Sequence, residues 1–367
     1  MSKLNCRALG QSATLLAFAC LMVLAHSAAG ADLTQLETGA QHGSIRKQLQ
    51  LGADYFLGHG VQRNEELAAY WYEKAANSGD STAQLQIGYF YQVGIGVSRD
   101  AARAAHWYQL AAAGGSAVAK MNLGVAYLWG AGVPRDQTLA LQLFHQAADK
   151  GCATAAGYLG DAYALGVGVP KDLSAAEHWF AAGAKMHDPR SEARLASYFS
   201  GSIGQKMDLP KAAALLRESS GAGFVPAKHA LGLLIANHPE LSSSPNEAVQ
   251  LLEEASAAGT WKASAVLGAL ARDGRGLPTD ARAAYLHFKI AQLQGGDEGR
   301  DLVAVDLAKL TDKLSQEDAK ALDLKATQWV SRHSTRLEFV YKDGSPAFAL
   351  TAPNHELHAG RLMPNPD

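Results

Sequence analysis

A series of acidic side chains recurs along this chain at intervals that would suit chemistry. Its members, spaced by 36 residues or a multiple of 36, are Asp100, Asp136, Asp172, Asp208 and Asp280. Carboxylates can act as general acids or bases, or can bind a metal ion. However, Asn64 and Ser244 occupy the same register, and Asp, Asn and Ser are all preferred N-cap residues, whose side-chain oxygen accepts a backbone N–H. We therefore interpret the series as helix caps and not as catalytic groups.

The other residues that could do chemistry do not form a site. His106 and His178 share a register but lie two units apart, too far to coordinate one ion. His355 and His358 are three residues apart in a stretch that we expect to be irregular. Cys152 follows a glycine at an expected turn, and we interpret it as a small packing residue. Because no nucleophile motif is present, we expect no enzymatic activity, no cofactor and no metal.

A period of 36 residues defines the elements that carry these side chains. One register of this period is glycine in six units, at Gly52, Gly88, Gly124, Gly160, Gly232 and Gly268. A second register is alanine in all seven units, from Ala68 to Ala284. Seven units without an insertion indicate one supersecondary element that stacks on copies of itself.

Each unit has the pattern of a helical hairpin. In one unit, Ala83, Ile87 and Tyr91 recur at helical spacing and predict a buried stripe. A glycine inside a helix is about 1 kcal/mol less favourable than alanine, so its recurrence implies that two helices approach closely there. Gly94 and Gly96 then predict a turn, because no strand precedes them as a phosphate-binding loop would require. The second helix starts at the capping aspartate, and we assign its aromatic residues to the core.

These patterns give a complete division of the chain. We expect a signal peptide at 1–31, a capping helix at 32–43, seven repeats at 44–296, a degenerate helical pair at 297–333 and an irregular or disordered tail at 334–367. A short strand over residues 336–341 is one reading of the start of that tail. The fold class is therefore all-α, a solenoid of about seven to eight hairpins.

The N-terminus has the features of an export signal. Lys3 and Arg7 precede an apolar run over residues 13–25, and Ala29-Gly30-Ala31 fits a cleavage site. We expect cleavage after Ala31 and a periplasmic or secreted location, with an uncleaved anchor as the alternative. The run is too short for a comfortable membrane span, so we expect none in the mature chain. The formal net charge of −2 argues against a nucleic-acid partner.

One unit carries a recognisable consensus. Its matching positions are Ala119, Leu123, Gly124, Tyr127, Gly130, Gly132, Val133, Asp136 and Ala140. This pattern resembles the Sel-one-like repeat, a relative of the tetratricopeptide repeat, over about residues 44–296. The resemblance implies a right-handed superhelix of helical hairpins that acts as an adaptor in protein complexes. A cysteine-rich branch of the family is linked to β-lactam binding, but this chain lacks the paired cysteines of that branch.

One face of the first helices varies from unit to unit, whereas the small and aromatic positions recur. We call it the variable stripe, and we expect it to contact a partner through Gln86, Tyr89, Asn122, Val125, Trp129, Tyr158, Asp161 and Arg194. Tyrosine and tryptophan are enriched at binding hot spots. The alternative is that these are ordinary solvated or inter-repeat residues.

Two functions remain open from the sequence. The first is a non-enzymatic scaffold of the bacterial envelope that binds a protein or peptide in the concave groove of the solenoid. The second is a protein that binds peptidoglycan or another envelope glycan, or that regulates an enzyme acting on it. Co-purification of a protein partner with the chain would favour the first function. Retention of the chain on a purified polymer would favour the second.

Overall fold

The computed structural model describes residues 33–203, 207–244 and 246–341. Among these residues every regular element is a helix, and the one β-type pairing is an isolated bridge between Ser200 and Met207, which confirms the all-α fold. The chain forms two compact units, and the division falls between Ser191 and Glu192, inside α11 (Pro189–Phe199). The expected signal peptide and residues 342–367 of the expected tail lie outside the described residues.

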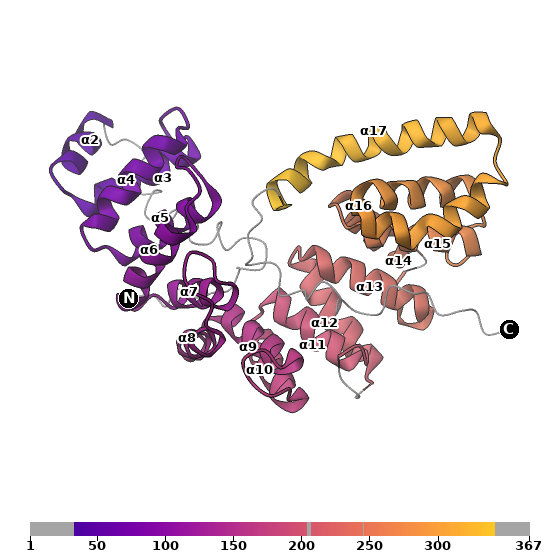
Figure 1. Cartoon of the computed structure of the whole chain (residues 1–367), viewed down its shortest axis with the longest axis horizontal. Coiled ribbons are helices and arrows are strands. Elements are labelled where there is room, and N and C mark those ends of the chain that lie inside the picture. Colours follow the sequence, from indigo (N-terminus) through magenta and orange to yellow (C-terminus); the bar gives the residue numbers. More distant parts are fainter. Residues whose placement is uncertain (1–32, 204–206, 245, 342–367) are drawn as a thin grey trace. The chain divides into compact units, whose positions relative to one another are not determined.

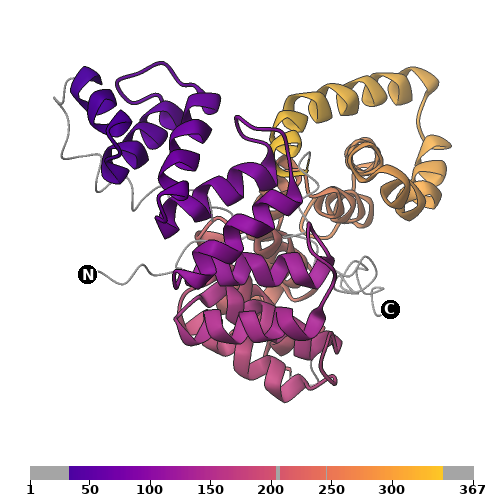
Figure 2. The same cartoon turned by 60° about the vertical axis from the view of Figure 1, so that its left-hand side comes forward.

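The first unit is a row of helices in which each packs on the next along the chain (Figures 1 and 2). Its helices are α2 (Leu33–Gln41), α3 (Ile45–Leu57), α4 (Glu65–Asn77), α5 (Ser81–Val93), α6 (Ala101–Ala113), α7 (Ala117–Trp129), α8 (Gln137–Asp149), α9 (Ala153–Leu165) and α10 (Leu173–Lys185). The helix α2 occupies the place of the expected capping helix, and its Leu36 and Ala40 pack with Leu51 and Trp71.

Close packing inside each hairpin explains the recurring glycine. A Cβ added at Gly124 of α7 would lie 2.7 Å from the ring of Phe144 and 3.1 Å from the carbonyl oxygen of Ala140, both on α8. The ring of Tyr108 holds the same place at Gly88, and the ring of Phe180 does so at Gly160. The expected packing role of this register is confirmed. The second helix approaches so closely that its aromatic ring lies against the glycine.

Capping by the aspartate series is also confirmed. Asp136 accepts a hydrogen bond from the backbone N–H of Leu139 at 2.9 Å, and Asp100 accepts one from Arg103 at 3.0 Å. The remaining members, Asp172, Asp208 and Asp280, cap α10, α12 (Leu209–Gly221) and α16 (Ala281–Thr311) in the same way. Each carboxylate satisfies a backbone donor that the helix leaves without a partner.

Replacing Asp136 with alanine is expected to lower the free energy of unfolding by about 1 kcal/mol, because the N–H of Leu139 loses its acceptor. Chemical denaturation of the purified chain measures this. Asp136→Asn keeps a capping oxygen and should stay within a few tenths of a kcal/mol of wild type. If both variants lose the same stability, the carboxylate does not act as a cap.

Taken by itself, the second unit is also a row of packed helices, with the longest ones at its end (Figure 1). After α11 come α12 (Leu209–Gly221), α13 (Val225–Asn237), the short 3-10 helix η1 (Pro239–Leu241), α14 (Glu247–Ala257), α15 (Trp261–Asp273), α16 (Ala281–Thr311) and α17 (Gln316–Tyr341). The left-handed Gly296 (φ 57°) breaks α16 into two helical segments, so its second segment and α17 occupy the place of the expected degenerate pair. Among the described residues, no helix is long and apolar enough to cross a membrane.

Two expectations for the second unit are wrong. Residues 336–341 form the end of α17 and not a strand, so helix continues eight residues into the segment expected to be irregular. Ser244 does not cap α14, which has Asn246 at its N-cap position without a side-chain cap bond. The carboxylate of Glu247 instead accepts from the backbone N–H of Ser243, the residue before Ser244, at 2.6 Å.

Glu247 gives the stability of this unit a predictable pH dependence. Burial alone would raise the pKa of Glu247, but hydrogen bonds from Arg217 and Ser243 lower it to about 2. Because the folded pKa is below the ordinary value of 4.5, this contribution is present above that pH and is lost as the pH falls toward 2. Glu247→Gln should therefore lower the free energy of unfolding at pH 7 by roughly 2–3 kcal/mol, and this loss relative to wild type should shrink by pH 2. A difference in stability between wild type and Glu247→Gln that does not change between pH 7 and pH 2 would contradict this role of Glu247.

Candidate functional site

The variable stripe is only partly exposed. Tyr89, Asn122, Trp129 and Arg194 are half-buried. The other four members are buried, which makes the expectation of a solvent-exposed face wrong for them: Gln86, Val125, Tyr158 and Asp161. The half-buried members of the first unit are Tyr89 on α5 and Asn122 and Trp129 on α7.

Two of the buried members belong to the hydrophobic core. Val125 packs with Met121 and Leu128 in the cluster that α7 shares with α8 and α9. The ring of Tyr158 stacks on Phe144, with ring centroids 5.0 Å apart and an angle of 9° between the planes. Helical spacing alone could not reveal this, because a tyrosine suits both a core and a binding surface.

A buried polar cluster joins α9 to the start of α11, all within the first unit. We call it the α9–α11 polar cluster, and it comprises Thr154, Tyr158, Asp161, Asp188, Arg190 and Ser191. Asp188 accepts hydrogen bonds from the Ser191 backbone N–H at 2.8 Å, from its hydroxyl at 2.6 Å and from the Thr154 hydroxyl at 3.2 Å. Asp188 therefore caps α11 and ties it to α9.

Arg190 is the only cation of this cluster. Its guanidinium lies 4.8 Å from the centre of the Tyr158 ring and 3.6 Å from an oxygen of Asp161. Burial alone would lower the pKa of Arg190, but Tyr158, Asp161 and Asp188 raise it, so the side chain stays charged. Burial raises the pKa of Tyr158, whose hydroxyl stays protonated. The ion pair between Arg190 and Asp161 therefore serves packing between α9 and the start of α11.

The sequence contained a signal for this cluster. The second-helix register that is alanine at Ala75, Ala111 and Ala147 becomes glycine at Gly183. The hydroxyl of Ser191 occupies the space that a Cβ at Gly183 would fill. A glycine that breaks the repeat therefore marks the position where a polar side chain enters the core.

Two members of the variable stripe have a buried side-chain donor without a hydrogen-bond acceptor among the described residues. The two donors are the side-chain amide nitrogen of Gln86 on α5 and the indole nitrogen of Trp129 on α7. Gln84, two residues before Gln86, donates instead to the carbonyl oxygen of Ala76 at 3.2 Å. Most buried polar groups in proteins have a partner, so the two unpaired donors need an explanation.

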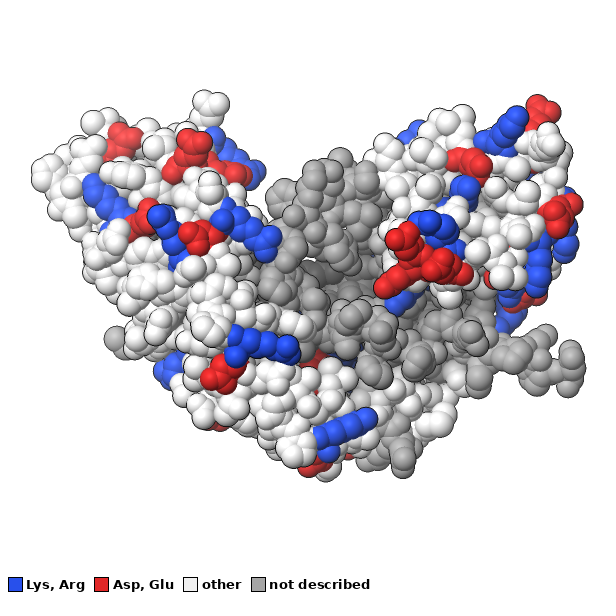
Figure 3. Space-filling model, viewed as in Figure 1, with Lys and Arg blue, Asp and Glu red and all other residues white. Residues whose placement is uncertain are grey.

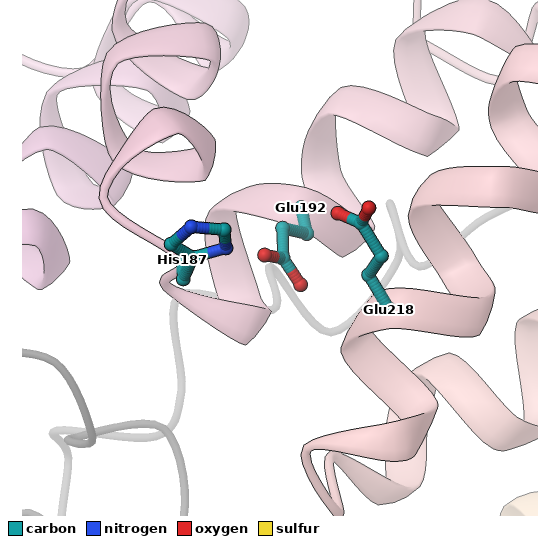
Figure 4. Close-up of side chains that lie close together, drawn as sticks. All are labelled: His187, Glu192 and Glu218. Carbon is teal, nitrogen blue, oxygen red and sulfur yellow. The ribbon is translucent and has the colours of Figure 1, made fainter.

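No metal or catalytic group is assigned to the described residues. Figure 4 shows Glu192 on α11 and Glu218 on α12 projecting toward one another in the second unit, with carboxylate oxygens within 4.8 Å. The third labelled side chain, His187, belongs to the first unit and precedes α11. His106 and His178 are exposed and lie beside Trp107 and Trp179. Cys152 is buried at the start of α9, and His355 and His358 lie outside the described residues.

Hairpins that pack a ring on a glycine and cap their second helices with aspartate define a helical-repeat protein. A family model for the Sel1 repeat matches seven consecutive segments: residues 48–80, 81–116, 117–152, 153–188, 189–224, 226–260 and 261–295. The chain belongs to the Sel1 repeat family, as the consensus in the sequence predicted.

Solved structures of similar proteins agree with this assignment. A Sel1 repeat protein from Oxalobacter formigenes is 31% identical, with a TM-score of 0.54, over 58% of this chain and 85% of that chain. A protective antigen of uropathogenic Escherichia coli with an SLR fold is 23% identical, with a TM-score of 0.50, over 84% of this chain and 73% of that chain. This second likeness concerns the fold alone. A search of curated proteins gives no match.

Proposed function

We propose that this chain is a non-enzymatic scaffold of the bacterial envelope that binds a protein or peptide along the first helices of its repeats. Sel1 repeat proteins generally act as scaffolds in protein–protein interactions. One observation carries the proposal. Residues that recur are used in packing and capping, as at Gly124 and Asp136, whereas Tyr89, Asn122 and Trp129 vary between repeats and stay partly exposed.

The charge pattern on the face that Figure 3 shows suits a specific partner better than a polyanion. In the view of Figure 3, lysine and arginine lie among aspartate and glutamate on both units, and neither sign forms a continuous field on that face. A nucleic-acid surface would need a basic patch or stripe. Local contacts therefore determine what binds.

Export to the envelope is part of the proposal and is tested separately. The positive residues, apolar run and Ala29-Gly30-Ala31 of the N-terminus support it. Fractionation of bacteria that express the full chain should place the protein in the periplasm or the medium. Sequencing of the mature N-terminus should begin at Asp32. A chain that remains in the cytoplasm with Met1 intact would overturn the location.

Co-purification tests the scaffold itself. The tagged chain is expected to retain one envelope protein in stoichiometric amount, and Asn122→Ala should reduce that retention with an unchanged melting temperature. Gln109→Ala, at an exposed position of α6, is the matched control and should retain the partner fully. Retention of the chain on purified peptidoglycan, with no protein partner, would favour the polymer-binding alternative.

A further inference from the structure

The last described repeat of the second unit leaves an apolar face uncovered. The second segment of α16 and the helix α17 form this repeat, at the edge of the unit (Figure 1). On that segment Leu302 is 49% exposed and Val305 is 63% exposed. Their equivalents in earlier repeats, Val266 on α15 and Leu233 on α13, are only 4% and 3% exposed. A register that the preceding repeats bury is therefore open at the end of the row.

The helix α17 contributes to the same face. Counted from the N-cap residues Asp280 and Ser315, Leu324 of α17 corresponds to Lys289 of α16. Lys289 points to the following repeat, where its ammonium lies 3.3 Å from an oxygen of Asp323. Leu324 holds that outward register on the last described helix, and it is 61% exposed. We call the following set the C-terminal end face: Glu298, Leu302, Val305, Lys309 and Leu324.

The part of this face on α16 is complementary to a second copy of itself. Glu298, Leu302, Val305 and Lys309 are spaced by four, three and four residues, so they lie along one side of the helix. In a two-fold contact, residue i meets residue j of the other copy and j meets i. Two antiparallel copies of the stripe would therefore place Leu302 against Val305, and Glu298 against Lys309. Both charged side chains are exposed, and neither forms an ion pair with another described residue.

The other charges near the stripe do not disturb this pairing. Asp306 is held by Arg272 at 2.6 Å, and Asp297 and Arg300 pair with each other. Within four residues of Leu302, Val305 and Leu324, the other exposed charges are Asp301, Lys320 and Lys325. These three are of both signs, as the polar rim of a self-associating face requires.

The N-terminal end of the chain differs from the C-terminal end face. There α2 buries Leu36 and Ala40, and its exposed residues after Leu33 are polar: Thr34, Gln35, Thr38 and Gln41. A polar outer face is what a terminal unit of a helical repeat array needs for solubility. A head-to-tail contact would place the apolar C-terminal end face on this polar cap. A contact between two C-terminal end faces buries apolar surface on both sides.

We propose that the C-terminal end face joins two copies of this chain in a two-fold dimer, with the second segments of α16 antiparallel. The contact continues the packing that buries the same register in the earlier repeats, and two-fold symmetry closes the assembly at two chains. The proposal does not depend on the scaffold function. If that function holds, the dimer presents two sets of partner-binding helices.

Sedimentation equilibrium of the purified chain tests the dimer. The wild-type chain should have the mass of two chains and should dissociate on dilution. Val305→Asp places a charge at the centre of the face and should give the mass of one chain, with unchanged helical circular dichroism. The matched control is Met207→Asp, at an apolar position of the second unit that is 68% exposed, and it should remain dimeric.

Reversing the charges tests the antiparallel arrangement. Glu298→Lys would bring two cations together at each contact, and Lys309→Glu would bring two anions together. Each single variant should raise the dissociation constant of the dimer at least tenfold, because like charges that face each other oppose association. An equimolar mixture of the two variants should form dimers again, since each chain then faces one of opposite charge at both contacts.

Five results would overturn the inference. A wild-type chain that stays monomeric at every soluble concentration is one, and a Val305→Asp chain that remains dimeric is another. A mass that keeps rising with concentration would indicate head-to-tail assembly. Dimers that form only when residues 342–367 are removed would assign the face to that segment. A monomeric chain that loses a co-purifying protein on Val305→Asp would assign the face to that protein instead.

Discussion

Gly124→Val is expected to destabilise the chain by at least 3 kcal/mol. A single Cβ at this position would already lie 2.7 Å from Phe144 and 3.1 Å from the carbonyl of Ala140, so the γ-methyl groups must push α7 and α8 apart. Inserting atoms into a packed core typically lowers stability by 1–3 kcal/mol, and valine adds three carbons where no space exists. Thermal and denaturant unfolding of the purified variant measure the loss.

Gly124→Ala gives a sharper test because two effects oppose each other. Helix propensity alone favours alanine by about 1 kcal/mol. Contact with Phe144 and Ala140 should outweigh this and make the net change destabilising. The control is Gly221→Ala in α12, where an added Cβ meets no atom within 4 Å, so propensity alone should stabilise the chain. If both alanine variants gain stability, the glycine register does not serve close packing.

Repetition explains why so much of the fold could be predicted. A residue that returns at the same register in most of the seven repeats, such as Gly124 or Asp136, must satisfy a contact that is made in each of those repeats. Its role could therefore be deduced without coordinates. The turn glycines Gly94 and Gly96 likewise have the positive φ angles that their spacing predicted, 89° and 62°.

The candidate site could not be predicted to the same degree, because it consists of residues that do not repeat. Tyr158 and Asp161 differ from their equivalents in neighbouring repeats, which suggested a binding role. They differ because Arg190 and Ser191 enter the core only at this junction. Variation between repeats therefore marks either a partner contact or a local change in packing, and only three-dimensional neighbours separate the two.

Loss of the arginine at this junction is expected to be the other large effect. Arg190→Met should lower the free energy of unfolding by about 3–5 kcal/mol, because it leaves Asp161, which is 3% exposed, without its cation. Methionine keeps much of the side-chain length, so the loss reports charge more than volume. Denaturant unfolding of wild type and variant at neutral pH provides the measurement.

A second substitution identifies the cause of that loss. Asp161→Asn in the Arg190→Met background removes the uncompensated charge, so the double variant should be more stable than Arg190→Met alone. For comparison, Arg63→Met breaks an exposed ion pair with Glu65 and should change stability by less than about 1 kcal/mol. If Arg190→Met is as mild as Arg63→Met, or if the double variant recovers nothing, the α9–α11 polar cluster does not hold α9 and the start of α11 together through charge. The buried members Tyr158 and Asp161 would then have to be reconsidered as part of a binding surface.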